Sequence, residues 1–269
     1  MKMKIFGSDL DRTLIYSRKI LAEFPTTAEI HPVEMNKGET ISYISAKAKE
    51  LLFQLQKEML FVPVTTRTTA QYNRISLFQN EINPEYAITC NGAHILHRGE
   101  PLQEWEVYIQ NQLKSVSSIE EIEQKLNQYK PAQWLLEIRK AESLFLYCMI
   151  DREKMESIEF QYLKSWAIGQ GWEMSLQGRK LYFVPKVIQK WEAFQFLSDK
   201  LELTERYTAG DSLLDYELIK NSKFGLAPLH GEVCEYDSAL VLTKIAGVHA
   251  ADEILERVLL ETKHSLPTF

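Results

Sequence analysis

Short apolar runs alternate with helical patterns at both ends of this 269-residue chain. Residues 44–57, for example, place their apolar side chains on one face of a helix, and residues 60–65 follow as a short apolar strand. Such alternation is typical of a parallel sheet covered by helices on both faces. The pattern predicts strands at residues 4–9, 60–65, 85–90, 206–209, 223–227 and 239–243, and helices at residues 44–57, 68–78, 190–201, 212–220 and 249–262.

The middle of the chain has a different pattern, with adjacent β-rich runs joined by short polar connections. We expect antiparallel hairpins there, and therefore an α+β insert at residues 95–183. The predicted fold is α/β: a Rossmann-like core with a parallel sheet, formed by residues 1–94 and 184–269, plus the inserted α+β domain. The insert's hairpins are predicted at residues 134–140 with 143–150 and 172–176 with 180–185, and its helices at residues 105–116, 118–129 and 152–169.

Composition narrows the class of protein. Hydrophobic residues make up 45% of the chain and charged residues 25%, as in a soluble globular protein. The net charge is −6 and no dense Lys/Arg run occurs, so no nucleic-acid partner is expected. No apolar signal segment or membrane-length apolar run is present, so we expect a cytoplasmic protein with no membrane partner. The isolated Cys90, Cys148 and Cys234 are interpreted as free thiols.

Two carboxylates, Asp9 and Asp11, come at the end of the first predicted strand. Ligands of open α/β sheets bind beyond the carboxyl ends of the strands, and side chains two apart point to the same side. One carboxylate can attack a phosphorus and form an aspartyl-phosphate, while the other protonates the leaving oxygen and later activates water. The pair therefore points to phosphoryl-transfer chemistry with Asp9 and Asp11 as catalytic residues.

A second acidic pair, Asp211 and Asp215, follows a predicted strand and begins a predicted helix. Carboxylates next to an anionic substrate repel it unless a cation intervenes, and Mg²⁺ binds few protein carboxylates together with substrate phosphate oxygens. We therefore expect a Mg²⁺ cofactor near Asp9, Asp11, Asp211 and Asp215.

Phosphate also needs hydrogen-bond donors and a positive charge. Thr65 ends a predicted strand, and Thr66 and Arg67 follow it at the start of the next helix. Lys190 begins the helix after the insert and offers a point charge to a phosphoryl group and to Asp9. We expect Thr65 and Lys190 to be catalytic and phosphate-binding, with Thr66 and Arg67 as further substrate contacts.

These segments, in this order, resemble the four motifs of the haloacid dehalogenase superfamily, within its phosphatase branch. The resemblance makes Asp9 the nucleophile and Asp11 the general acid/base, whose main-chain carbonyl also binds Mg²⁺ in the family. It makes Thr65 the phosphate-binding hydroxyl, Lys190 the motif lysine, and the Gly210-Asp211-Ser212-Leu213-Leu214-Asp215 segment the acidic metal-binding motif.

The position of the insert, between the second and third motifs, resembles the larger C2 class of cap domain. Cys90-Asn91-Gly92-Ala93 is similar to the entry of Cof-type caps, which makes Asn91 a candidate substrate contact. The resemblance covers nearly the whole chain. It implies Mg²⁺-dependent hydrolysis of small phosphomonoesters, most of all sugar phosphates, through an aspartyl-phosphate.

The chain departs from the family pattern at several points. Arg12 and Thr66 stand where these phosphatases usually carry glycine, and Leu214 replaces a common asparagine. Residues 17–43 are longer than the direct turn into a helix found in most capped members. We interpret them as an enlarged β-hairpin flap that overhangs the active site and narrows substrate choice, through Arg18, Lys19 or His31.

Other interpretations of these residues stay open at this stage. Lys186 competes with Lys190, Arg67 can pair with a carboxylate instead of substrate, and Asn91 can simply shape a turn. The same scaffold also serves phosphomutases, phosphotransferases and non-catalytic regulatory or binding proteins. Substrate identity and oligomeric state are not readable from the pattern.

Overall fold

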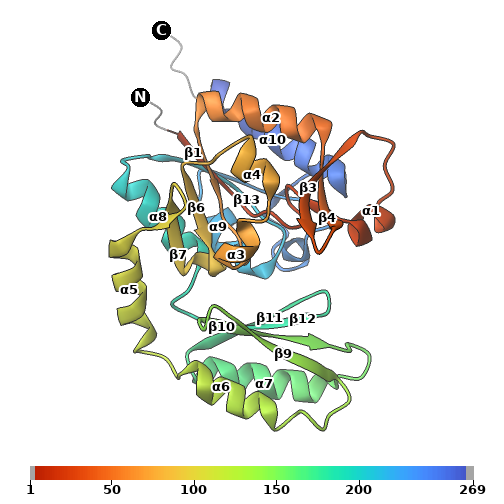
Figure 1. Cartoon of the computed structure of the whole chain (residues 1–269), viewed down its shortest axis with the longest axis vertical. Helices are drawn as coiled ribbons and strands as arrows, with labels where there is room; N and C mark the ends of the chain where they lie inside the picture. Colours follow the sequence, from red (N-terminus) through yellow and green to blue (C-terminus); the bar gives the residue numbers. More distant parts are fainter. Residues whose placement is uncertain (1–3, 265–269) are drawn as a thin grey trace. The chain divides into compact units, whose positions relative to one another are not determined.

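The computed structural model describes residues 4–264 (Figure 1). These residues form two compact units. The first joins the N-terminal part of the chain, up to Pro101, to the C-terminal part from Lys190 onward, and the second is the insert Leu102–Gln189. The unit boundaries lie later than the expected residues 95 and 183. Residues 94–97 and 100–101 form strands that pair within the first unit, and the last strand of the insert runs to Pro185.

A parallel sheet lies at the centre of the first unit, with the strand order β15-β14-β13-β1-β5. The carboxyl ends of its strands therefore share one edge. The strands are β1 (Lys4–Ser8), β5 (Leu60–Pro63), β13 (Glu205–Ala209), β14 (Phe224–Ala227) and β15 (Val241–Leu242).

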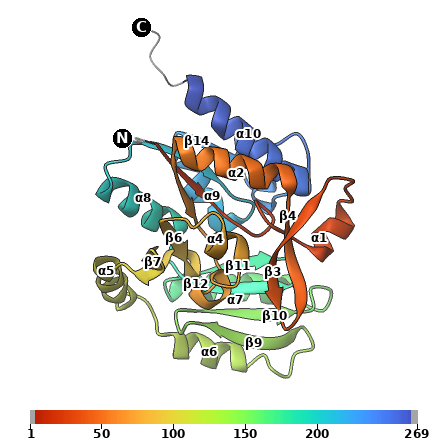
Figure 2. The same cartoon turned by 45° about the horizontal axis from the view of Figure 1, so that its top comes forward.

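Helices cover both faces of this sheet, as the sequence predicts (Figures 1 and 2). Phe6 of β1 belongs to the apolar cluster that also contains Leu52 and Ile254 from the helices on one face. Gly7, the next residue, faces the other way, and a Cβ there would lie 2.5 Å from the ring of Phe194. The helices of this unit include α2 (Ala46–Glu58), α8 (Lys190–Lys200), α9 (Tyr216–Lys220) and α10 (Val248–His264), with 3₁₀ turns at Cys90–Gly92, Leu213–Asp215 and Glu232–Glu235.

The segment expected to be a flap contains a hairpin, and the structure adds a short helix to it. Strands β3 (Ile30–Asn36) and β4 (Glu39–Ser45) are joined by a two-residue turn in which Lys37 and Gly38 have φ values of 50° and 82°. Two positive φ values are typical of the turn that matches strand twist in hairpins. The sheet order is β2-β4-β3, with β2 (Tyr16–Ser17) at one edge, and α1 (Arg18–Glu23) follows β2.

Two helices of the core begin or end differently from the sequence prediction. Residue 44 belongs to β4, and α2 starts after Ser45, whose hydroxyl accepts a hydrogen bond from the Ala48 amide. The helix expected at residues 68–78 is two shorter ones, α3 (Thr69–Tyr72) and α4 (Ser76–Asn80), because Ile75 forms a β-bridge with Glu34. A small antiparallel sheet with the order β6-β7-β8 follows: Tyr86–Thr89, His94–His97 and Glu100–Pro101.

The second unit is an antiparallel sheet with helices, which agrees with the α+β prediction. Its strand order is β11-β12-β10-β9, and the tight turn between β9 and β10 has positive φ at Glu142 and Ser143. Trp134 and Trp172 are buried core residues. The elements are α5 (Gln103–Leu113), α6 (Ile119–Asn127), β9 (Leu135–Ala141), β10 (Phe145–Ile150), α7 (Ser157–Gly169), β11 (Trp172–Gln177) and β12 (Lys180–Pro185). Across residues 4–264, no helix combines the length and the apolarity that a membrane span requires.

Candidate active site

Neighbouring strands bring three predicted site residues to one edge of the parallel sheet. Asp9 follows β1, Asp211 comes shortly after β13, and Thr65 follows β5. The Asp9 amide donates to the Ala209 carbonyl at 2.9 Å, so the β1–β13 pairing continues to the first carboxylate. All three residues are buried. Parallel strand pairing is thus the reason that residues about 200 positions apart in the sequence meet here.

Lys190 is the first residue of α8 and is buried between two of the aspartates. Its Nζ lies 2.6 Å from Asp9 Oδ1 and 2.6 Å from Asp215 Oδ1. Burial opposes a charge at this position, but Asp215 and Asp9 together raise the pKa of Lys190 above its ordinary value. The structure thus places Lys190, the residue preferred over Lys186, as a permanent cation beside Asp9.

Asp215 is held by the residues that begin its own turn. Its Oδ2 accepts hydrogen bonds from the Ser212 amide at 2.9 Å and the Ser212 hydroxyl at 2.7 Å. The 3₁₀ turn Leu213–Asp215 closes a capping box between these two residues. Ser212 therefore orients Asp215 toward Lys190. Sequence reasoning did not identify this role, although the Ser-x-x-Asp spacing signals it.

The carboxylates of Asp9, Asp211 and Asp215 form a compact group of possible metal ligands. Oxygens of the three side chains all lie within 4.8 Å of one another. Burial raises the pKa of Asp9 to about 7, even though Lys190 lowers it, and burial and the charge of Asp9 raise the pKa of Asp211 well above its ordinary value. Close, buried carboxylates with insufficient positive charge match the oxygen ligands that Mg²⁺ prefers. The donor set therefore fits a divalent cation.

Arg12, at the position usually held by glycine, adds a second cation to this group. Its backbone has a φ of 67°, in the left-handed region, and its Nε donates to Asp211 Oδ2 at 2.9 Å. Arg12 Nη2 donates to the His230 carbonyl, and the Arg12 carbonyl accepts from His230 Nε2 at 2.9 Å. Because His230 Nδ1 accepts from the Gly247 amide, Nε2 carries the ring proton. Sequence reasoning did not identify the role of His230, and no motif signals it.

The residues expected to bind phosphate lie close together after β5 and β6. The hydroxyl of Thr65 is buried and accepts a hydrogen bond from the Arg67 amide at 3.1 Å. The main-chain N–H of Asn91 donates to the main-chain carbonyl of Thr65 at 2.9 Å, and Asn91 has a φ of 60°. Thr66 is half-buried. Asn91 thus shapes the turn beside Thr65, while its expected contact with substrate stays a prediction.

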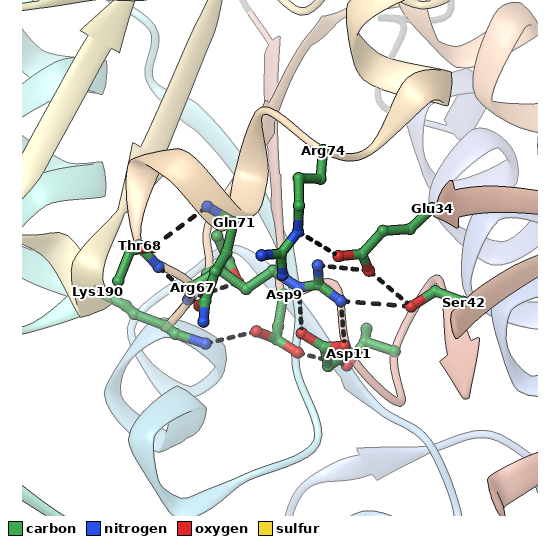
Figure 3. A network of polar contacts seen from close by, with 11 residues as sticks. Asp9, Asp11, Glu34, Ser42, Arg67, Thr68, Gln71, Arg74 and Lys190 are labelled. Carbon is green, nitrogen blue, oxygen red and sulfur yellow. Dashed lines mark hydrogen bonds and ion pairs between the residues drawn. The ribbon is translucent and has the colours of Figure 1, made fainter. Parts of the chain in front are cut away.

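Asp11 lies outside the buried group and is bound by Arg67 (Figure 3). Arg67 Nε donates to Asp11 Oδ2 at 2.7 Å, and Arg67 Nη2 donates to Asp11 Oδ1 at 2.8 Å. Arg67 Nη1 donates to a different carboxylate, Glu34, at 2.7 Å from its Oε2. Arg67 therefore pairs with carboxylates, one of the two roles left open by its sequence position. Glu34 also accepts hydrogen bonds from the Ser42 hydroxyl and from Arg74 Nε, and no recognisable sequence signal marks these three residues.

Of the residues proposed to give the flap its selectivity, Arg18 donates from Nε to the hydroxyl of Tyr43 on β4 at 3.0 Å. His31 Nε2 lies 3.4 Å from Oε1 of Glu29, the residue before β3. Lys19 is exposed. Their expected effect on substrate choice stays a prediction.

Comparisons with known proteins identify the family and the fold of the chain. Residues 2–253 match the family model of sucrose-6F-phosphate phosphohydrolase. No curated protein sequence matches the chain significantly.

Solved structures share the fold. The sucrose-phosphatase of Synechocystis sp. PCC6803, solved with sucrose and phosphate, is 18% identical, with a TM-score of 0.68 over 97% of this chain and 98% of that one. The sugar phosphatase BT4131, of haloacid dehalogenase subclass IIB, is 14% identical, with a TM-score of 0.63 over 96% and 99%. A HAD/COF-like hydrolase from Plasmodium vivax is 10% identical, with a TM-score of 0.64 over 97% and 96%.

The family match covers almost all of the described residues, and the matched region includes the aspartates, the lysine and the threonine discussed above. The fold of the solved structures agrees with it. The chain belongs to the sucrose-6F-phosphate phosphohydrolase family, a family of phosphatases within the haloacid dehalogenase superfamily.

Proposed function

We propose that this protein is a Mg²⁺-dependent phosphomonoester hydrolase that forms an aspartyl-phosphate on Asp9. The observation that carries the proposal is the buried group of Asp9, Asp211 and Asp215, in which the ammonium of Lys190 pairs with Asp9 and Asp215. A nucleophilic carboxylate, a fixed cation and a divalent-metal donor set together are what an in-line attack on a phosphate dianion needs.

The first half-reaction uses Asp9 and Asp11. Asp9 Oδ1 is held by Lys190, and Asp9 Oδ2 accepts from the Thr13 hydroxyl at 3.3 Å, so the carboxylate is oriented before substrate arrives. A carboxylate oxygen of Asp9 forms a bond to phosphorus as the bond from phosphorus to the ester oxygen breaks. Asp11 gives its proton to the departing oxygen.

The second half-reaction releases phosphate. Asp11, now a carboxylate, removes a proton from water, and that water attacks the phosphorus of the aspartyl-phosphate. Asp9 is regenerated as a carboxylate. Lys190 and the Thr65 hydroxyl would stabilise the phosphoryl oxygens in both steps.

Asp9, Asp211, Asp215 and the main-chain carbonyl of Asp11 would hold Mg²⁺, which would supply charge neutralisation to the phosphoryl oxygens. Lys190 and Arg12 carry two positive charges against three buried carboxylates, so the group keeps an excess of negative charge that a divalent cation would neutralise. The donor set thus favours a metal-loaded resting enzyme.

We propose small organic phosphates, and sugar phosphates in particular, as the substrate class. The matching family is described by a sugar-phosphate reaction, and two similar structures are a sucrose-phosphatase bound to sucrose and phosphate and a sugar phosphatase. A trehalose-6-phosphate phosphatase related protein, 17% identical with a TM-score of 0.55, has the same fold. We also propose that the inserted unit acts as a cap, since it is inserted between β8 and Lys190 in the chain.

Phosphate release from a panel of sugar monophosphates, measured with Mg²⁺ or with EDTA, tests this function. The proposal predicts turnover by the wild type with Mg²⁺, none with EDTA, and none in Asp9→Asn. Asp199→Asn, an exposed aspartate on α8, is the matched control and should behave as the wild type. Mg²⁺-independent release, or release that survives in Asp9→Asn, would rule out the mechanism. Transfer of the phosphoryl group to a second alcohol would instead assign phosphotransfer.

A further inference from the structure

The general acid/base proposed above, Asp11, is in an exposed position. Its side chain is 50% accessible to solvent, and the next residue, Arg12, has positive φ. A solvent-exposed carboxylate samples several rotamers unless something holds it, and general acid catalysis needs it within hydrogen-bond reach of the leaving oxygen. Asp11 therefore depends on a neighbour for its position.

That neighbour is Arg67, which binds Asp11 through a two-pronged contact. Nε and Nη2 of the guanidinium donate to the two carboxylate oxygens at 2.7 and 2.8 Å. Such a bidentate contact fixes direction as well as distance. When one oxygen of Asp11 carries a proton, the other still accepts from Arg67, so the contact can hold the group through both half-reactions.

Arg67 is itself held by the β3–β4 hairpin. Glu34 of β3 has a fully buried side chain, and its Oε2 accepts from Arg67 Nη1 at 2.7 Å and from the Ser42 hydroxyl at 2.9 Å. The other oxygen of Glu34 accepts from Arg74 Nε at 3.2 Å. Ser42 lies on β4, opposite Glu34 in the strand pairing, and its hydroxyl is 3.4 Å from Arg67 Nη2. Both strands of the hairpin thus hold the guanidinium (Figure 3).

A local irregularity in β3 turns Glu34 inward. The register of the β3–β4 pairing shifts on both sides of Glu34, between Pro32 and Glu34 and again between Glu34 and Met35. In a regular strand, consecutive side chains point to opposite faces, yet Val33 and Glu34 are both buried. A β-bulge permits this by re-aiming one side chain. The hairpin is therefore built to direct a carboxylate at Arg67.

We propose that Glu34 is a positioning residue for the general acid/base, acting on Asp11 through Arg67, so that the hairpin supports catalysis. This inference rests on the proposed function. It adds a role for the segment in which the chain departs from its family, and it makes no claim that Glu34 touches substrate.

Two esters with different leaving groups test the proposal. A sugar monophosphate releases an alkoxide that needs the proton of Asp11, whereas 4-nitrophenyl phosphate releases a stable phenolate that does not. The value of kcat/KM reports the steps up to departure of the alcohol. In Glu34→Gln we expect kcat/KM for the sugar phosphate to fall by at least about tenfold more than kcat/KM for 4-nitrophenyl phosphate.

A second variant covers the case in which loss of the buried charge impairs folding. Arg67→Lys keeps the positive charge beside Glu34 but removes the bidentate contact, and it should shift the ratio of the two kcat/KM values in the same direction. Glu39→Gln, an exposed glutamate on the same hairpin, is the matched control and should leave the ratio unchanged.

A purely structural role for Glu34 would lower both rates equally. If kcat/KM for the two esters fell by the same factor in Glu34→Gln and in Arg67→Lys, so that their ratio did not change, the inference would be overturned. Asp9-dependent hydrolysis by the wild type would still support the proposed function. If the wild type hydrolysed neither ester, both the proposed function and this inference would be overturned.

Discussion

Replacing the proposed nucleophile should make the metal-free protein more stable, because Asp9 is a buried carboxylate with too little positive charge around it. Burial raises the pKa of Asp9 from its ordinary 3.8 to about 7. In the unfolded chain, the group is charged above pH 3.8 at no cost. In the folded protein without metal, it is protonated up to about pH 7. The contribution of Asp9 to the free energy of unfolding is therefore greatest below pH 3.8, declines as the pH rises, and is lost above pH 7.

The size of the effect follows from that difference in pKa. A rise of the pKa of Asp9 from 3.8 in the unfolded chain to about 7 in the folded protein lowers the free energy of unfolding by roughly 4 kcal/mol between low and high pH. Asp9→Asn removes the charge and keeps an oxygen that can accept from Lys190, which still pairs with Asp215 at 2.6 Å. A neutral acceptor bonds Lys190 less strongly than a carboxylate does, so we expect a net gain of about 2 kcal/mol at pH 8.

Thermal unfolding in EDTA at pH 5 and pH 8 measures this. We expect the melting temperature of Asp9→Asn to exceed that of the wild type at pH 8 by several degrees, at about 2–4 °C per kcal/mol, and by less at pH 5. Added Mg²⁺ should raise the melting temperature of the wild type more than that of the variant. A variant less stable than the wild type at pH 8 in EDTA, or a difference that does not change with pH, would refute the reasoning. Asp199→Asn serves as the control for loss of one exposed carboxylate.

Other substitutions test the remaining contacts. Arg12→Gly removes the guanidinium that binds Asp211 and should tighten Mg²⁺ binding about tenfold, as measured by calorimetric titration; weaker binding would show that Arg12 instead orients Asp211. Lys190→Met leaves buried carboxylates without their cation, so we expect the free energy of unfolding to fall by about 3–5 kcal/mol at pH 8. The loss should be smaller at pH 5, where protonation removes the negative charge. Urea unfolding in EDTA measures this, and equal losses at the two pH values would contradict it. Gly7→Ala places a Cβ against the ring of Phe194 and should cost about 1–3 kcal/mol, much of which Phe194→Leu in the same chain should recover; an unchanged midpoint in Gly7→Ala would contradict the contact.

The parts of the site that could be predicted are those that depend on strand ends. Asp9, Thr65 and Asp211 each come at or just after the end of a parallel strand, and parallel strands share one carboxyl edge. A short apolar run followed by a polar residue is visible in one sequence, so their convergence follows from the fold class alone. The sequence pattern predicts a helix that begins at Lys190, and in the structure the ammonium of Lys190 lies beside Asp9.

The parts that could not be predicted depend on irregular backbone. Glu34 reaches Arg67 from a part of β3 where the pairing register shifts, and residue patterns assume regular alternation. The break between α3 and α4 has a similar cause: a β-bridge from Ile75 to Glu34 interrupts a run that reads as one helix. Arg12 adopts a φ of 67° that its side chain disfavours, and its contacts with Asp211 and His230 are formed across the fold. Such features are set by tertiary contacts.

The covalent state of Asp9 during turnover tests the central claim most directly. The protein would be mixed with a ³²P-labelled sugar phosphate and Mg²⁺, quenched in acid within one turnover, and digested for peptide mapping. The account predicts label on the peptide that contains Asp9, none with EDTA, and none in Asp9→Asn. Release of labelled phosphate at full rate without label on that peptide at any quench time, or label that persists in Asp9→Asn, would contradict it.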